Sequence, residues 1–123
     1  THCVQGTRDA ALHDGLRVDH AQLIIRKGFR REIDSYSAFV EAVRRTTTGL
    51  AAYLQARGVR RLFLCGLATD YCVAWSALDA RAAGFSATVI EDACRAIDLD
   101  GSLARAWADM AAAGVGRIRS DQI

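Results

Sequence analysis

Short apolar runs and segments of helical spacing alternate through the second half of the chain. Residues 62–66 form an apolar run of strand length, and residues 85–90 are rich in β-branched side chains. Residues 102–113 place Leu103, Trp107 and Met110 on one face of a helix. We therefore expect strands at residues 62–66, 85–90 and 115–119, and helices at residues 72–84 and 102–113.

Glycine marks the end of three predicted helical segments. Gly58, Gly84 and Gly114 each follow a helical segment and precede a strand candidate. A glycine just past a helix takes the left-handed conformation at low cost, so it indicates a C-cap. Strand, helix, glycine and strand in repetition are typical of βαβ units. The pattern predicts an α/β domain with a parallel sheet.

The first half of the chain is less regular. Residues 21–26 predict a further strand, which ends at Lys27 and Gly28. Residues 37–57 have a mostly helical composition, interrupted by the threonines at 46–48 and by Gly49. We expect one of these threonines to cap a helix that begins near Leu50.

Composition narrows the class of protein. A length of 123 residues suits one domain, and a net charge of +2 with scattered basic residues favours neither nucleic acid nor a membrane surface as a partner. No apolar run approaches the ~18 residues of a membrane span. The four cysteines fit neither a zinc ribbon nor a disulfide scaffold, which favours reduced thiols in a cytoplasmic protein.

Two residues at strand ends are candidates for chemistry. Ligands of open α/β sheets bind at the carboxyl ends of the strands. Lys27 follows one predicted strand, and Cys72 follows the strand at 62–66 after a turn. The amides at the start of a helix and a nearby lysine would favour a thiolate and could hold an oxyanion. Free cysteines are more often small buried apolar residues, so spacing alone leaves the role of Cys72 open.

The motifs themselves resemble a known family. Residues 65–73, Cys-Gly-Leu-Ala-Thr-Asp-Tyr-Cys-Val, are similar to the nucleophile segment of nicotinamidases, also called pyrazinamidases, in the isochorismatase-like superfamily. Residues 2–7 resemble the segment near the metal, residues 26–28 the lysine segment, and residues 34–39 the loop that lines the pocket. The resemblance covers essentially the whole chain, and the segments occur in the family's order.

This resemblance implies an amidohydrolase that converts nicotinamide into nicotinate and ammonia through a cysteine thioester. The nucleophile would be Cys72 and the catalytic lysine Lys27. The oxyanion hole would be formed by the amides of Ala68 and Cys72, with a cis peptide bond between Leu67 and Ala68. An ordinary trans turn is the alternative. Pyrazinamide would be a further substrate.

The resemblance also implies a divalent metal, zinc, iron or manganese, with His2 as a ligand. Tyr36 would lie beside the substrate ring. His13 and His20 match no functional residue, and we interpret both as surface residues. Asp70 is expected to bond turn amides, Cys65 and Cys94 to be inert, and Trp75 and Trp107 to belong to the core.

Other parts of the family pattern have no counterpart in these residues. The family's catalytic aspartate and its remaining metal ligands precede the position that matches Thr1. Its three-layer αβα fold has the strand order 3-2-1-4-5-6. Residues 21–26 match the third strand and 61–66 the fourth, so the first two strands are lacking.

We therefore expect the C-terminal portion of one domain, which neither folds stably nor hydrolyses anything until an upstream segment or chain completes it. The whole could form a homo-oligomer.

Three alternatives remain. Ureidoacrylate and N-carbamoylsarcosine amidohydrolases share the cysteine and lysine but lack the metal cluster, while isochorismate hydrolases lack the cysteine. The second alternative is a non-catalytic domain of this fold, because the family's catalytic aspartate and most of its metal ligands have no counterpart in these residues. A redox module that uses Cys65 and Cys72 is disfavoured, because a disulfide across the turn between them is geometrically awkward.

Overall fold

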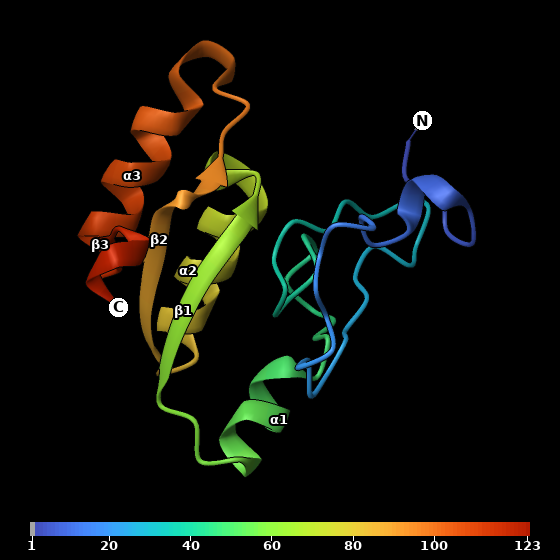
Figure 1. Cartoon of the computed structure of the whole chain (residues 1–123), viewed down its shortest axis with the longest axis horizontal. Helices are drawn as coiled ribbons and strands as arrows, with labels where there is room; N and C mark the ends of the chain where they lie inside the picture. Colours follow the sequence, from blue (N-terminus) through green and yellow to red (C-terminus); the bar gives the residue numbers. More distant parts are fainter. Residues whose placement is uncertain (1) are drawn as a thin grey trace.

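The computed structural model describes residues 2–123, and regular structure is concentrated after residue 49 (Figure 1). The longer elements are α1 (Leu50–Ala56), β1 (Arg61–Leu67), α2 (Ala74–Ala82), β2 (Ser86–Arg95), α3 (Ser102–Ala112) and β3 (Gly116–Ile118). The shorter ones are three 3-10 turns, η1 (Arg8–Ala10), η3 (Leu99–Gly101) and η4 (Ser120–Gln122), and a π-helical turn, η2 (Thr69–Val73). No helix in the described range is both long and apolar enough to cross a membrane.

The strands form one parallel sheet in the order β1-β2-β3. Leu62 lies opposite Ala87, and Thr88 lies opposite Gly116. Each strand is joined to the next by a helical connection, which is what a parallel pair requires. The predicted α/β class and the three strands of the second half are therefore confirmed, although β2 continues to Arg95, five residues beyond the predicted end at Ile90.

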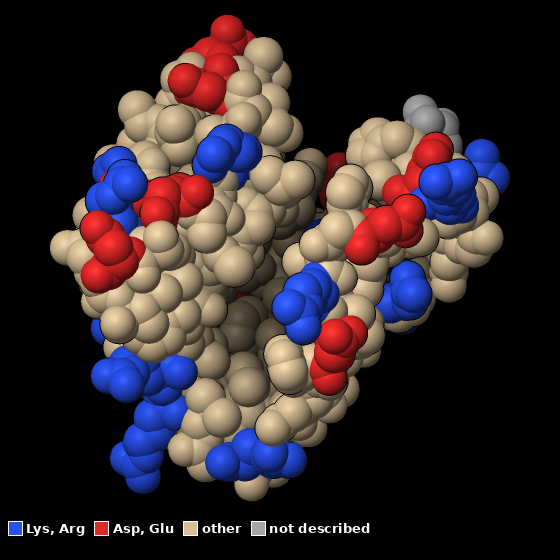
Figure 2. Space-filling model, in the orientation of Figure 1, with Lys and Arg blue, Asp and Glu red and all other residues tan. Residues whose placement is uncertain are grey.

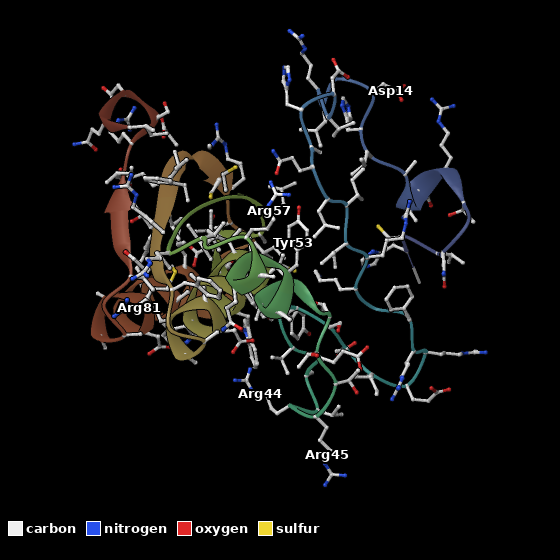
Figure 3. All side chains as sticks on the ribbon, turned by 90° about the horizontal axis from the view of Figure 1, so that it is seen from below. Asp14, Arg44, Arg45, Tyr53, Arg57 and Arg81 are labelled. Carbon is white, nitrogen blue, oxygen red and sulfur yellow. The ribbon has the colours of Figure 1, made fainter. Side chains whose placement is uncertain are left out.

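The core lies between the sheet and the helices α2 and α3, which cover the same face (Figures 1 and 3). Ala77 and Ala80 of α2 and Val89 of β2 are fully excluded from solvent, and Met110 of α3 is 1% exposed. Full burial of a side chain such as Met110 contributes about 1.5–3 kcal/mol. Of the apolar stripe predicted on residues 102–113, Met110 is therefore part of the core and Trp107 packs against it.

The predicted glycine caps have the left-handed backbone that the motif requires. Gly58, Gly84 and Gly114 have φ values of 69°, 91° and 76°. After each of them, an amide bonds back to a carbonyl of the preceding helix, as Phe85 N–H does to Ala80 O at 2.9 Å. These bonds satisfy helix carbonyls that would otherwise lack partners.

Two expectations for the first half are wrong. Residues 21–26 form no strand, because an extended segment becomes a strand only beside a ladder partner and none lies next to it among residues 2–123. Residues 37–49 are not helical either. Val40 and Thr47 form an antiparallel bridge, and Thr48 N–H donates to Phe39 O at 3.0 Å, so these main-chain groups are used across a tight loop.

The threonine run nevertheless acts at the start of α1. The Thr48 hydroxyl accepts a hydrogen bond from Leu50 N–H at 3.2 Å and donates to Ala38 O at 2.6 Å. The N-cap residue itself is Gly49, which makes no side-chain bond. Thr48 thus ties the start of α1 to the loop of residues 37–49, although Gly49, and not a threonine as expected, holds the N-cap position.

The edge of β1 away from β2 has no strand beside it in the described structure. Phe63 is 43% exposed and Leu67 is 73% exposed, although both belong to an apolar strand. Residues 2–49 lie on this side of the sheet in Figure 1, and Figure 2 shows a deep hollow between them and β1. Phe63, Leu67 and Cys72 line a groove beside this edge.

Candidate active site at the end of strand β1

Cys72 lies on the turn that directly follows β1. Residues Thr69–Val73 form a π-helical turn, so α2 begins at Ala74, and Cys72 precedes the first α-helical residue instead of starting the helix as predicted. The carbonyl of Ala68 accepts the amides of Tyr71 and Val73, both at 3.1 Å. The peptide bond between Leu67 and Ala68 is cis. The Cys72 side chain is half-buried and faces an open groove of about 310 Å³ beside Phe63, Leu67 and Val73.

Lys27 reaches Cys72 from the other half of the chain. Its Nζ atom lies 3.6 Å from Cys72 Sγ and donates a hydrogen bond to Ser35 O at 2.6 Å. The two residues are 45 positions apart in sequence, and the structure brings them together although Lys27 follows an irregular segment instead of a strand. An ammonium group at this distance stabilises a thiolate more than a thiol.

Tyr36 stands in an aromatic group next to the nucleophile turn. Its ring centroid lies 5.9 Å from that of Tyr71 and 5.7 Å from that of Trp75. The negative charge of Asp34 raises the pKa of the Tyr36 phenol, and burial and the neighbouring Cys72 add to the effect. The phenol is therefore protonated at neutral pH and can donate a hydrogen bond. The expectation that Trp75 belongs to the core is wrong, because Trp75 is 39% exposed beside Tyr36.

Ser76 links the loop that follows Tyr36 to the backbone of Cys72. Its hydroxyl donates to Cys72 O at 2.6 Å and accepts Ala38 N–H at 2.9 Å, and the side chain is 7% exposed. Sequence reasoning missed this residue. A signal was available, because Ser76 lies four positions after Cys72 and therefore on the same helical face.

Asp70 holds the opposite side of the same turn. Its carboxylate accepts Ile97 N–H at 3.1 Å, Asp98 N–H at 2.8 Å and the Ser102 hydroxyl at 2.5 Å. Burial acts to raise the pKa of Asp70, but these three donors outweigh it and leave the pKa below its usual value. As expected, Asp70 accepts hydrogen bonds from backbone amides. These amides belong to the connection between β2 and α3 and not to the turn of Asp70 itself.

The remaining thiols have different surroundings. Cys3 and Cys65 are exposed, whereas Cys94 is buried within β2, and burial raises the pKa of its thiol. Burial outweighs the opposing effect of the neighbouring Arg95 cation, and a buried thiol with a raised pKa reacts slowly. All four cysteines are free thiols in this structure, and Cys72 is the one that contacts a lysine ammonium.

The candidate metal ligand His2 is exposed near the start of the described chain. Within residues 2–123 no group of three or more histidine, cysteine or acidic side chains could hold a metal ion. These residues therefore do not form a metal site by themselves. His13 and His20 are exposed, as expected for surface residues.

Comparison with known proteins places this geometry in a family. The isochorismatase domain family matches residues 1–122. A curated relative, the nicotinamidase of Acinetobacter baylyi, is 60% identical over 123 residues, which are 100% of this chain and 58% of the relative. The chain therefore belongs to the isochorismatase family, and it spans less than two thirds of the length of that relative.

Solved structures agree with this assignment. An Acinetobacter baumanii nicotinamidase pyrazinamidase is 56% identical with a TM-score of 0.97, over 99% of this chain and 59% of that chain. An L. infantum protein in complex with nicotinate is 45% identical with a TM-score of 0.93, over 98% of this chain and 60% of that chain. The expected isochorismatase-like fold is confirmed.

A more distant structure was solved with a metal. The pyrazinamidase of Pyrococcus horikoshii in complex with zinc is 34% identical with a TM-score of 0.80. The match covers 97% of this chain and 62% of that one.

Proposed function

We propose that this chain supplies the nucleophile half of an amidohydrolase that converts nicotinamide into nicotinate and ammonia. The observation that carries the proposal is the 3.6 Å contact between Cys72 Sγ and Lys27 Nζ beside a π-helical turn. Support comes from the nicotinamidase relative at 60% identity and from the similar structure that binds nicotinate. Pyrazinamide, which has the same carboxamide on an aromatic ring, is a second substrate in this proposal.

The reaction would proceed in two steps. The Cys72 thiolate attacks the amide carbonyl, the carbon–nitrogen bond breaks, and the nitrogen leaves as ammonia after gaining a proton from the acid–base aspartate of the completed protein. Water then attacks the thioester, the carbon–sulfur bond breaks, and nicotinate leaves while Cys72 returns as a thiolate. Of the two protons that the water loses, one returns to the aspartate and the other passes to solvent. Lys27 would offset the negative charge on sulfur in the free enzyme and again as each intermediate collapses.

The turn would also supply the oxyanion hole. The amides proposed for the oxyanion are those of Ala68 and Cys72, as the family resemblance implies, and the Tyr71 and Val73 amides of the same turn donate to Ala68 O instead. Tyr36, with Trp75 beside it, would pack against the pyridine ring. In this arrangement the pyridine ring of the substrate would lie next to the half-buried Cys72 thiol.

The proposed active protein is larger than these residues. A preceding segment or separate chain would pair with the free edge of β1 and supply the acid–base aspartate and most metal ligands, with His2 as one ligand of a divalent ion. A homo-oligomer of the completed protein in the cytoplasm is part of the same proposal. A Lewis acid bound there would orient the substrate ring.

The decisive experiment measures ammonia release from nicotinamide by the completed protein and by its Cys72→Ala variant. We expect turnover in the wild type, a loss of at least about 10³-fold in the variant, and a thioester mass on the Cys72 peptide in quenched wild-type samples. The matched control is Cys65→Ala, which removes the exposed thiol of β1 and should retain activity. Turnover that survives Cys72→Ala would contradict the proposal. If the completed protein hydrolyses ureidoacrylate or N-carbamoylsarcosine and not nicotinamide, the function is that of the corresponding amidohydrolase.

A further inference from the structure

The buried carboxylate of Asp70 connects three elements around the nucleophile. Asp70 lies on η2, two residues before Cys72, and is 6% exposed. Its three donors belong to the connection after β2 and to the first residue of α3, Ser102. A carboxylate that accepts three hydrogen bonds away from water holds its position firmly, because moving it would leave both the charge and its donors unpartnered.

The segment on the other side of these bonds has an unusual backbone. Asp98 and Asp100 adopt left-handed conformations, with φ values of 54° and 51°, and Gly101 follows at 77°. Asp98 in turn accepts Leu103 N–H at 3.2 Å. Non-glycine residues keep such conformations only where the surroundings enforce them. Asp70 therefore fixes this connection and the η2 turn against each other.

We infer that Asp70 is a positioning residue for Cys72, which holds the η2 turn so that the Cys72 thiol and the neighbouring amides keep their geometry towards an acyl substrate. The inference rests on the proposed role of Cys72. It assigns Asp70 no contact with substrate, since all three of its described partners lie on the β2–α3 side of the turn.

The chain contains a matched control for this interaction. Asp92, near the end of β2, accepts Ser120 N–H at 2.8 Å and the Ser120 hydroxyl at 2.6 Å. The chemistry is the same as in the Asp70–Ser102 pair, but Asp92 ties down η4 and not the nucleophile turn. Asp70→Asn and Asp92→Asn each replace a carboxylate by an isosteric amide that cannot accept all of the original donors.

The test compares both variants in the completed protein. The first readout is the rate of Cys72 alkylation by iodoacetamide at one neutral pH, measured by peptide mass spectrometry with Cys65 as the internal reference. The second readout is kcat and KM for nicotinamide. For Asp70→Asn we expect both Cys72 alkylation and kcat to fall about tenfold or more, and KM to stay within about threefold, since the loss of an oxyanion donor outright costs about 10²–10³. Asp92→Asn should leave all of these values within about twofold.

Several outcomes separate the possibilities. If Asp70→Asn lowers the melting temperature but leaves the Cys72 to Cys65 alkylation ratio and kcat unchanged, Asp70 is a structural tie and the inference is overturned. If this variant fails to fold, Ser102→Ala removes one donor, and an unchanged alkylation ratio there overturns it equally. A wild type that alkylates normally but releases no ammonia from nicotinamide would overturn the proposed function alone.

Discussion

At the scale of single residues, Lys27 holds its ammonium group beside Cys72 through a second contact. The bond from Nζ to Ser35 O restrains a side chain that would otherwise be free in solvent. The neighbouring Arg26 carries the same charge and is exposed. Lys27 and Arg26 therefore differ in whether the cation contacts the Cys72 thiol, and substitution of each residue tests the effect of this contact.

Replacement of Lys27 by methionine should lower kcat/KM for nicotinamide by about 10²–10³-fold, because a charge that stabilises the thiolate and the transition state is removed. Steady-state ammonia release from the completed protein measures this loss. Arg26→Met removes an equal charge one residue away and should change kcat/KM by less than about threefold. Equal losses in the two variants would show that net charge, and not the Lys27–Cys72 contact, is responsible.

Asp70 should also make folding stability depend on pH. Because its pKa is lower in the folded protein than the ordinary value near ~3.9 in the unfolded chain, its contribution is complete above that value and is lost as pH falls through the folded pKa. Urea unfolding from neutral pH to about pH 3 measures this. The difference in free energy of unfolding between wild type and Asp70→Asn should be constant near neutrality and shrink below pH ~4. A difference that stays constant to the acid end would contradict the prediction.

At the scale of elements, the site depends on how α2 and the loop of residues 37–49 are joined. Periodicity predicts β1, β2, α3 and their glycine caps because those elements bury apolar faces or end in a specific backbone conformation. The loop of residues 37–49 escapes prediction, since its composition favours helix while a long-range bond to Ser76 of α2 and a bond within the loop from Thr48 to Ala38 determine its path. Propensity is overridden wherever side chains from another element capture the backbone.

Ser76→Ala should destabilise the completed protein by about 1 kcal/mol, because the partly buried Cys72 carbonyl and Ala38 amide each lose a partner. We also expect a higher KM for nicotinamide, since the loop of residues 37–49, which directly follows Tyr36, is no longer tied to the nucleophile turn. Denaturant unfolding and steady-state kinetics measure the two effects. Ser76→Thr keeps the hydroxyl and should recover most of both, and a KM unchanged in Ser76→Ala would contradict the proposed link.

At the scale of the whole molecule, the described sheet is one-sided. Three strands carry helices α2 and α3 on one face, while β1 leaves a free edge with exposed Phe63 and Leu67. Unpaired apolar edges favour association with another strand. Residues 2–49 contribute little regular structure that could cover this edge.

The isolated chain of residues 1–123 should therefore show no cooperative thermal unfolding and no nicotinamide turnover. Calorimetry and an ammonia assay on the refolded chain check this. Addition of the N-terminal segment of the Acinetobacter baylyi relative that precedes its match to this chain should restore both, because it would supply the missing partner for β1. Cooperative melting with full turnover by the chain alone would contradict the prediction.

Local pattern alone determined the parallel α/β class, the second-half elements and the choice of Cys72 and Lys27 as candidates. These depend on periodicity, on the backbone freedom of glycine and on motif segments, all of which are properties of short stretches. Only the tertiary structure decided that the Lys27 ammonium reaches Cys72, that Ser76 and Asp70 hold the nucleophile turn, and that residues 21–26 form no strand. Contacts between residues far apart in sequence depend on how whole elements pack, and a strand exists only when another strand lies beside it.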